Sequence, residues 1–208
     1  MQTHAMRIHS NSFEPGKPIA EEFALGGAGG FGGNRNPHLA WQHAPPATRA
    51  FALLCIDADA PTDPSLAGRE GVEIPVAHPR GEFVHWVMAD IPAEVREVAA
   101  GSCSDGVDKG GKRLPRGPAG ARQGLNDYTG WFADSDDMRG DYLGYDGPYP
   151  PPNDLRVHRY FFRLFSLDVE TLALPERFAA RNVFRAMHGH VLAEASVHGT
   201  YSLNPGAA

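Results

Sequence analysis

Cysteine is scarce in this chain of 208 residues, which has two thiols, Cys55 and Cys103. Two cysteines make no disulfide framework, and the apolar residues around Cys55 favour a buried, inert thiol there. Long apolar runs are also missing, since none approaches the length of a membrane span. The first residues lack the basic and then apolar pattern of a signal region, so we expect a cytoplasmic protein.

Positive charge is in short supply too. Nineteen Lys and Arg stand against 25 Asp and Glu, which gives a formal charge of −6 at pH 7, and no basic block stands out. This balance argues against nucleic acid and anionic membrane surfaces as partners. The glycine-rich run at residues 26–37 is followed by no Lys-Ser or Lys-Thr and lacks the flanking strand and helix of a phosphate loop. We interpret this run as a flexible surface loop.

The length and composition indicate one domain over residues 1–208. Hydrophobic residues make up 42% of the chain, an ordinary share for a globular core. The 24 glycines and 18 prolines lie between apolar runs, which indicates many turns rather than disorder, and no internal repeat is present.

The most informative stretch is Gly144–Leu167. Its first part, GYDGPYPPP, holds too many prolines and glycines for a helix or a central strand, and so forms a stiff loop. Its second part, His158–Leu167, is a strand by composition. Because side chains alternate along a strand, His158 and Tyr160 share one face. They line either one wall of a small polar pocket, or the end of a core strand where their polar atoms lie in water.

Several strands at turn-rich spacing with little helix predict a mainly β fold: an antiparallel β-sandwich-like domain with peripheral loops and a C-terminal α-helix. The remaining strands are expected at residues 6–12, 51–57, 82–91 and 197–202, with one or two helical turns at 93–100 and the best helix at 181–195.

Two strands carry further polar residues. Asp57 ends the apolar strand 51–57, and Asp59 lies on the same side if the chain stays extended. His85 shares a face of the strand 82–91 with Phe83 and Val87, and a histidine in such a place is usually a satisfied core or rim residue. The region 101–140 is long and irregular, a length typical of functional or disordered loops, and residues 133–141 form an acidic surface insert.

Four motifs in order resemble the phosphatidylethanolamine-binding protein family, and in particular its bacterial, Raf kinase inhibitor-like branch. They are DADAP, VHWVMADIP, GYDGPYPPPNDLRVHRYFFRLFSLD and GHVLAEASVHGTYS, and the resemblance covers about residues 10–204. It implies antiparallel sheets with a small cavity at one end that binds phosphate or a phosphoryl headgroup.

The resemblance also implies which residues bind that ligand. The family's motifs match Asp57, Asp59, His85, Gly147, Pro148, Pro150, Pro151, His158, Arg159 and Tyr160. The chain departs from the family pattern at Ala58, which replaces a proline, and at Tyr149, where bacterial members often have cysteine. Residues 153–157 before His158 also differ, and the insert at 133–141 lengthens the preceding loop. Ligand size and access to the pocket depend on these departures.

The chemistry of these residues fits binding better than turnover. We expect each carboxylate to hold an imidazole or a backbone amide, so that an outward imidazole N–H, the Tyr160 hydroxyl and loop amides near Gly147 donate to the anion. No nucleophile with a base and an orienting group can be assembled, so we expect no enzyme and no cofactor. The expected function is non-catalytic binding of a small anion, with regulation of a kinase or protease as its purpose.

Two alternatives stay open. Asp57, Asp59, His85 and His158 are suitable ligand types for zinc, which would make the chain a metal-dependent hydrolase. A scaffold protein with a vestigial pocket is the other. Besides the anion, the partners we consider are a regulated protein and a second copy of the chain in a homodimer.

Overall fold

The computed structural model describes residues 5–208, and most of its regular structure is strand. The elements are β1 Arg7–His9, η1 Glu21–Phe23, β2 Gly26–Gly27, β3 Gly30–Phe31, β4 Leu39–Gln42, β5 Ala50–Pro61, η2 Pro64–Leu66, β6 Arg80–Pro92, β7 Glu97–Val98, β8 Arg122–Gln123, α1 Tyr128–Trp131, β9 His158–Leu167, α2 Ala180–Ala186 and β10 Val191–Tyr201. Antiparallel sheets with few helices and a C-terminal helix confirm the predicted fold class.

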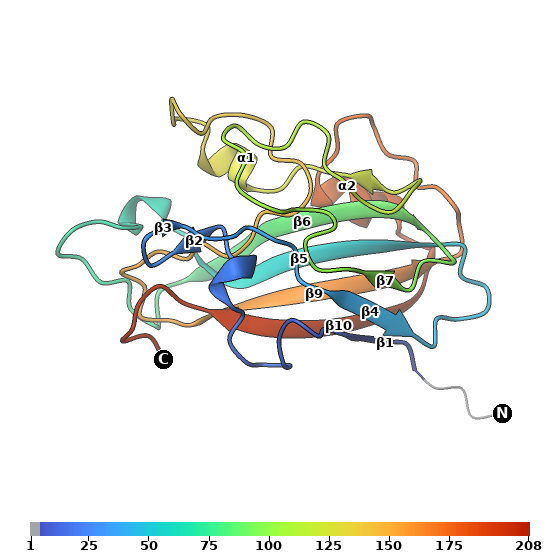
Figure 1. Ribbon diagram of the computed structural model, residues 1–208, viewed down its shortest axis with the longest axis horizontal. Helices are drawn as coiled ribbons and strands as arrows, with labels where there is room; N and C mark the ends of the chain where they lie inside the picture. The colour runs from blue at the N-terminus through green and yellow to red at the C-terminus, as the bar shows by residue number, and fades with distance from the viewer. Residues whose placement is uncertain (1–4) are drawn as a thin grey trace.

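A five-stranded sheet in the order β10-β9-β5-β6-β8 forms the centre of the molecule. A three-stranded sheet, β1-β4-β7, covers one of its faces, and α2 packs on the other (Figure 1). The long strands β5 and β9 pair antiparallel from Ala50↔Leu167 to Asp57↔Tyr160. This pairing carries Asp57 to the end of the sheet where the loops after β5 and before β9 meet.

The alternation predicted for β9 is confirmed. His158, Tyr160, Phe162 and Leu164 are each buried to about 1% exposure or less, and the last three belong to the core between the two sheets. Phe165 and Leu167 pack instead in the second core, beneath α2. The two polar residues at the start of β9 therefore continue the core face of the strand, where burial requires them to find partners.

A β-bulge changes the direction of His85. Along β5, Cys55 pairs with Trp86 while the next residue, Ile56, pairs with Val84, so His85 has no Cα partner in that ladder. Such an extra residue turns its side chain out of the alternation. The His85 ring accordingly lies 5.2 Å from the Tyr160 ring, whereas Val87 packs beneath α2. The prediction that His85 and Val87 share one face of the strand is therefore wrong.

The predicted helix at 181–195 was too long. The helix α2 ends at Ala186, Gly189 has a positive φ of 85°, and Val191 already pairs with Leu167 of β9. Pairing with a central strand overrides the helical pattern in this segment. Residues 93–100 form a turn and the short strand β7 rather than helical turns. No helix among residues 5–208 is long and apolar enough to cross a membrane.

The glycine-rich run is a packed hairpin of β2 and β3 rather than a surface loop throughout. Gly26 and Gly27 are buried, and a Cβ at Gly26 would lie 1.9 Å from the ring of Tyr149. The acidic insert is also anchored, because Met138 is buried and Arg177 binds the carboxylate of Asp141 at 2.7 Å. Hairpin, insert and proline-rich loop together shape the surroundings of the cavity described next.

Candidate functional site

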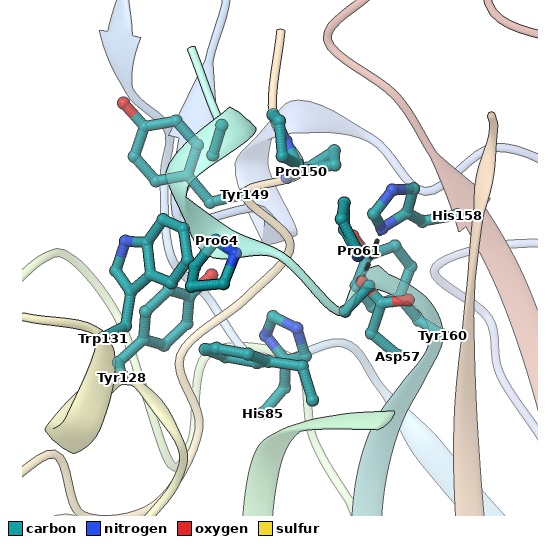
Figure 2. A pocket seen from close by; sticks show the side chains of 14 residues that line it. Asp57, Pro61, Pro64, His85, Tyr128, Trp131, Tyr149, Pro150, His158 and Tyr160 are labelled. Atoms are coloured by element: carbon teal, nitrogen blue, oxygen red, sulfur yellow. Dashed lines mark hydrogen bonds and ion pairs between the residues drawn. The ribbon is translucent and has the colours of Figure 1, made fainter. Parts of the chain in front are cut away.

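A cavity of about 60 Å3 opens at the end of the five-stranded sheet. Its lining residues are Asp57, Ala60, Pro61, Pro64, Ala67, Phe83, His85, Tyr128, Trp131, Tyr149, Pro150, Pro151, His158 and Tyr160. Figure 2 shows Asp57, His158 and Tyr160 on one side and Tyr128, Trp131 and Tyr149 on the other, with His85 between them. The structure therefore brings together Asp57, His85, His158 and Tyr160, which come from three different strands. This volume accommodates a small polyatomic group or a few water molecules.

His158 is held at both ring nitrogens. Its Nδ1 lies 2.7 Å from Asp57 Oδ2 and its Nε2 lies 3.0 Å from Asp154 Oδ2, with the ring 1% exposed. Only the imidazolium can donate to both carboxylates. Burial lowers the pKa of His158, but the hydrogen bonds and charges of Asp57 and Asp154 outweigh it and raise the pKa above its usual value. His158 is thus a fixed internal cation, and no ring N–H is left for a ligand.

Asp57 and Asp154 clamp His158 between them, and Asp154 does so from the loop before β9. Its carboxylate accepts two hydrogen bonds from Arg80, at 2.6 and 3.1 Å, and one from the backbone N–H of Arg156 at 2.9 Å. Burial raises the pKa of Asp154, but the hydrogen bonds from Arg80 and His158 lower it below its usual range. Sequence reasoning did not single out Asp154, because it lies in the segment 153–157 where the resemblance breaks down.

Asp57 and Asp59 act as the sequence predicts, each holding a donor of the protein. Asp57 Oδ1 accepts the backbone N–H of Asp59 at 2.8 Å. Asp59 does not line the cavity; it binds the guanidinium groups of Arg156 and Arg159 and the backbone N–H of Arg159. Burial raises the pKa of Asp59, but these hydrogen bonds and charges lower it overall. Asp59 and Arg159 therefore anchor the start of β9 instead of meeting a ligand.

His85, unlike His158, is bound to the protein through one ring nitrogen. Its Nδ1 lies 2.8 Å from the carbonyl of Asp146 and 3.1 Å from that of Gly147, so Nδ1 carries the proton. Within the described residues, Nε2 makes no hydrogen bond, and it faces the cavity (Figure 2). Burial lowers the pKa of His85 despite the charges of Asp57 and Asp127. His85 is thus neutral near pH 7, with a free nitrogen that can accept a proton.

A buried network holds the two carbonyls that bind His85. The carboxylate of Asp146 accepts from Lys112 Nζ at 2.6 Å and from the amides of Asn34 and Asn126 at 2.8 Å each. Lys112 also donates to the Tyr145 carbonyl at 2.8 Å. Neither Lys112 nor Asn34 was considered from the sequence, because Asn34 lies in the run interpreted as a surface loop and Lys112 in the long irregular region 101–140.

Gly147 and Pro148 lie behind the lining. The Gly147 N–H donates to Asn34 Oδ1 at 2.8 Å, and its carbonyl accepts from the Tyr128 hydroxyl as well as from His85. The Pro148 carbonyl accepts two backbone N–H groups, from Leu25 and Gly26. The Gly147 amide is therefore already bonded within the protein, and these two residues support the site rather than line it.

Tyr160 has a buried hydroxyl that lies near the Asp57 carboxylate but makes no hydrogen bond of ordinary geometry among the described residues. The residue is 0% exposed, and burial together with the charge of Asp57 raises its pKa well above the usual value. The hydroxyl therefore keeps its proton, and a buried donor without a partner costs about 1–3 kcal/mol. An orphaned polar group of this kind at a cavity is typical of a ligand site.

The residues of the hydrolase alternative are not arranged as metal ligands. Among residues 5–208, no three His, Cys, Asp or Glu side chains are placed to hold one ion. Asp59 is bound to two guanidinium groups, and His158 uses both nitrogens within the protein. Within residues 5–208, His85 Nε2 is therefore the one imidazole nitrogen of this set that makes no bond to the protein, and no two further His, Cys, Asp or Glu side chains are placed to bind a metal ion with it.

The fold and the site define a β-rich protein with a small cavity at one end of its central sheet. Residues 9–202 match the model of the phosphatidylethanolamine-binding protein family, and the chain belongs to that family. It is 31% identical over 198 residues to the UPF0098 protein of Aquifex aeolicus, a match that covers 94% of this chain and 88% of that protein.

Two solved structures of relatives share the fold. The crystal structure of Escherichia coli YbcL, described as a member of the mammalian PEBP family, has a TM-score of 0.70 at 25% identity and covers 96% of this chain and 99% of YbcL. The homologue CT736 of Chlamydia trachomatis has a TM-score of 0.65 at 27% identity, covering 95% of this chain and 97% of CT736.

Proposed function

We propose that this protein binds a small anion or the phosphoryl headgroup of a larger molecule in the cavity, without catalysing a reaction. The observation that carries the proposal is the buried Tyr160 hydroxyl, which makes no hydrogen bond of ordinary geometry within residues 5–208 and lines the same cavity as the free Nε2 of His85. In this arrangement the hydroxyl and a protonated His85 each donate one hydrogen bond to an oxygen of the anion. His158, bound at both ring nitrogens by Asp57 and Asp154, holds the Asp57 side of the cavity in place.

The regulatory role is part of the same proposal. The resemblance to the Raf kinase inhibitor-like branch suggests a kinase or protease as the regulated protein, with the ligand biasing the interaction. The mouth of the cavity supports this idea, because Trp131 and Tyr149 are 44% and 38% exposed there and are available to a protein partner.

Calorimetry with sulfate at about pH 6 tests the binding function. We expect heat of binding in the wild-type protein and an affinity about tenfold lower in Tyr160→Phe, since one hydrogen bond to a charged group is lost. Tyr142→Phe is the matched control, because the Tyr142 hydroxyl donates to the Met138 carbonyl away from the cavity. No binding in the wild type, or equal loss in both variants, contradicts the proposal.

A second measurement addresses catalysis. We expect no turnover of p-nitrophenyl phosphate or p-nitrophenyl acetate, because among the described residues no Ser, Cys or Lys lines the cavity to act as a nucleophile. A rate that persists through repurification and disappears in His85→Gln contradicts this expectation.

A further inference from the structure

The loop between β5 and β6, residues 62–79, forms one wall of the cavity. Its first part contributes Pro64 and Ala67 to the lining, and Pro64 and His85 both face the cavity in Figure 2. None of residues 62–73 is buried, so packing against the core holds this part of the loop only weakly. The position of this wall therefore depends on hydrogen bonds.

The side chain of Asn153 supplies those hydrogen bonds. Its Oδ1 accepts the backbone N–H of Gly68 at 2.8 Å, and its Nδ2 donates to the carbonyls of Leu66 and Val72, also at 2.8 Å each. The amide thus uses its oxygen and both of its hydrogens, which fixes its orientation. Among the described residues, no further hydrogen bond joins residues 63–73 to the rest of the chain.

The second part of the loop is held by other groups. Ile74 is fully buried, and its N–H donates to the backbone carbonyl of Asn153 at 2.9 Å. Arg80, which also binds Asp154, donates to the Pro75 carbonyl at 2.7 Å. This end of the loop keeps its place without the Asn153 side chain. Loss of the Asn153 amide therefore frees residues 63–73 alone.

The wall limits the bulk of a molecule that reaches His85. The closed cavity of about 60 Å3 accommodates a small polyatomic group, and a bulkier group reaches its floor only if a wall moves. Asn153 lies in the segment 153–157, where the chain departs from the family pattern on which access to the pocket depends. From the bonds and the exposure of the loop, and resting on the proposed function for the ligand itself, we infer that Asn153 is a positioning residue that holds this wall closed and so restricts the size of the ligand.

Chemical labelling of His85 tests the wall without any assumption about the ligand. Diethyl pyrocarbonate is bulkier than the cavity and acylates a neutral imidazole, and Nε2 of His85 is a nitrogen of this kind. His158 is bonded at both nitrogens and reports unfolding of the site, while the exposed His188 reports the exposure to reagent. Peptide mass spectrometry follows all three histidines in one sample.

We expect Asn153→Ala to raise the labelling rate of His85 at least about tenfold, because a net loss equal to about one hydrogen bond shifts the opening equilibrium by that factor. His158 should stay unlabelled in wild type and variant alike. Asn11→Ala is the matched control, since Asn11 is exposed and lies beside His38 rather than beside the loop. Equal rates for His85 in wild type and Asn153→Ala overturn the inference, and so does labelling of His158 as fast as that of His85.

An isosteric variant separates the hydrogen bonds of Asn153 from its packing. Asn153→Asp keeps the shape and the acceptor of the Gly68 N–H, but its second oxygen has no hydrogen to donate to the carbonyls of Leu66 and Val72. We expect faster labelling of His85 in this variant too. Labelling at the wild-type rate in Asn153→Asp would show that the two donated bonds do not hold the wall, and would overturn the inference.

Calorimetry connects the wall to the ligand. Methanesulfonate and 2-methylpropane-2-sulfonate are both monoanions and differ in the bulk next to the sulfonate. We expect wild type to bind the smaller anion at least about tenfold more tightly, and this ratio to fall toward one in Asn153→Ala but not in Asn11→Ala. An unchanged ratio in Asn153→Ala overturns the inference. If neither sulfonate nor sulfate binds to any of the proteins, the proposed function fails, and the labelling of His85 alone decides whether Asn153 holds the wall.

Discussion

Replacing the carboxylate of Asp154 should lower the free energy of unfolding by an amount that depends on pH. In Asp154→Asn the side chain keeps its shape, but a buried charge next to Arg80 and His158 is lost. Removing one partner of a buried ion pair typically costs about 3–5 kcal/mol, and we expect about 3 kcal/mol because the amide retains one acceptor. At an m value of about 3 kcal/mol/M, the urea midpoint falls by about 1 M.

The pH dependence follows from the directions in which the pKa values of His158 and Asp154 are shifted. The raised pKa of His158 means that its stabilisation is complete below the unfolded value of about 6.5 and is lost as pH rises through the folded pKa. The lowered pKa of Asp154 means that its stabilisation is present above about 4 and is lost as pH falls through the folded pKa. The difference between wild type and Asp154→Asn is therefore largest between about pH 4 and about pH 6.5.

Urea denaturation of both proteins from about pH 3 to about pH 9 measures this difference. Asp141→Asn is the matched control, since its ion pair with Arg177 is exposed and should contribute less than about 1 kcal/mol. A difference that rises between about pH 6 and about pH 9 would show that His158 is neutral in the clamp and would refute the reasoning.

Three further predictions follow from the same geometry. Tyr160→Phe should leave the free energy of unfolding unchanged or raise it by up to about 1 kcal/mol, because it removes an unpartnered hydroxyl; a loss above about 1 kcal/mol in urea denaturation is the contrary result. Lys112→Met should lower the free energy of unfolding by about 3 kcal/mol, because it breaks the buried ion pair with Asp146. Lys109→Met is the control and should have no effect, since the Lys109 side chain is 65% exposed. Equal effects of the two substitutions in urea denaturation would count against the buried network. Sulfate affinity should fall by up to about tenfold per pH unit above the lowered free pKa of His85, since the anion binds the protonated ring; a slope that survives in His85→Gln would assign the proton to another group.

Much of the fold could be predicted because its central strands carry local signals. The bounds of β9 follow from an uninterrupted aromatic and aliphatic segment after a proline-rich loop, and its alternation places His158 and Tyr160 correctly. The start of β10 could not be predicted from the same kind of signal. Val191 falls on the apolar stripe of a helix, yet it pairs with Leu167, a partner 24 positions earlier that no local pattern reveals.

The candidate site was predictable in its members but not in their roles. The family resemblance singles out Asp57, His85, His158 and Tyr160, and all four line the cavity, whereas the equally expected Asp59, Gly147 and Pro148 do not. The partners that decide their chemistry come from loops whose course the sequence does not specify. Asp154 occupies the second nitrogen of His158, and Lys112 reaches Asp146 across 34 positions of chain.

The surroundings of His158 and His85 thus shift the pKa values of these two histidines in opposite directions. His158, between two carboxylates, has a raised pKa and is charged; His85, buried against two carbonyls, has a lowered pKa and is neutral. A pair of titratable groups separated in this way can divide two tasks between them. His158 holds Asp57 and the start of β9 in place, while the proposed function has His85 take up a proton when an anion binds. Because the bulge at His85 turns its ring toward the cavity while Asp154 occupies the second nitrogen of His158, the backbone of β6 and one loop carboxylate together decide which histidine has a free nitrogen at the cavity.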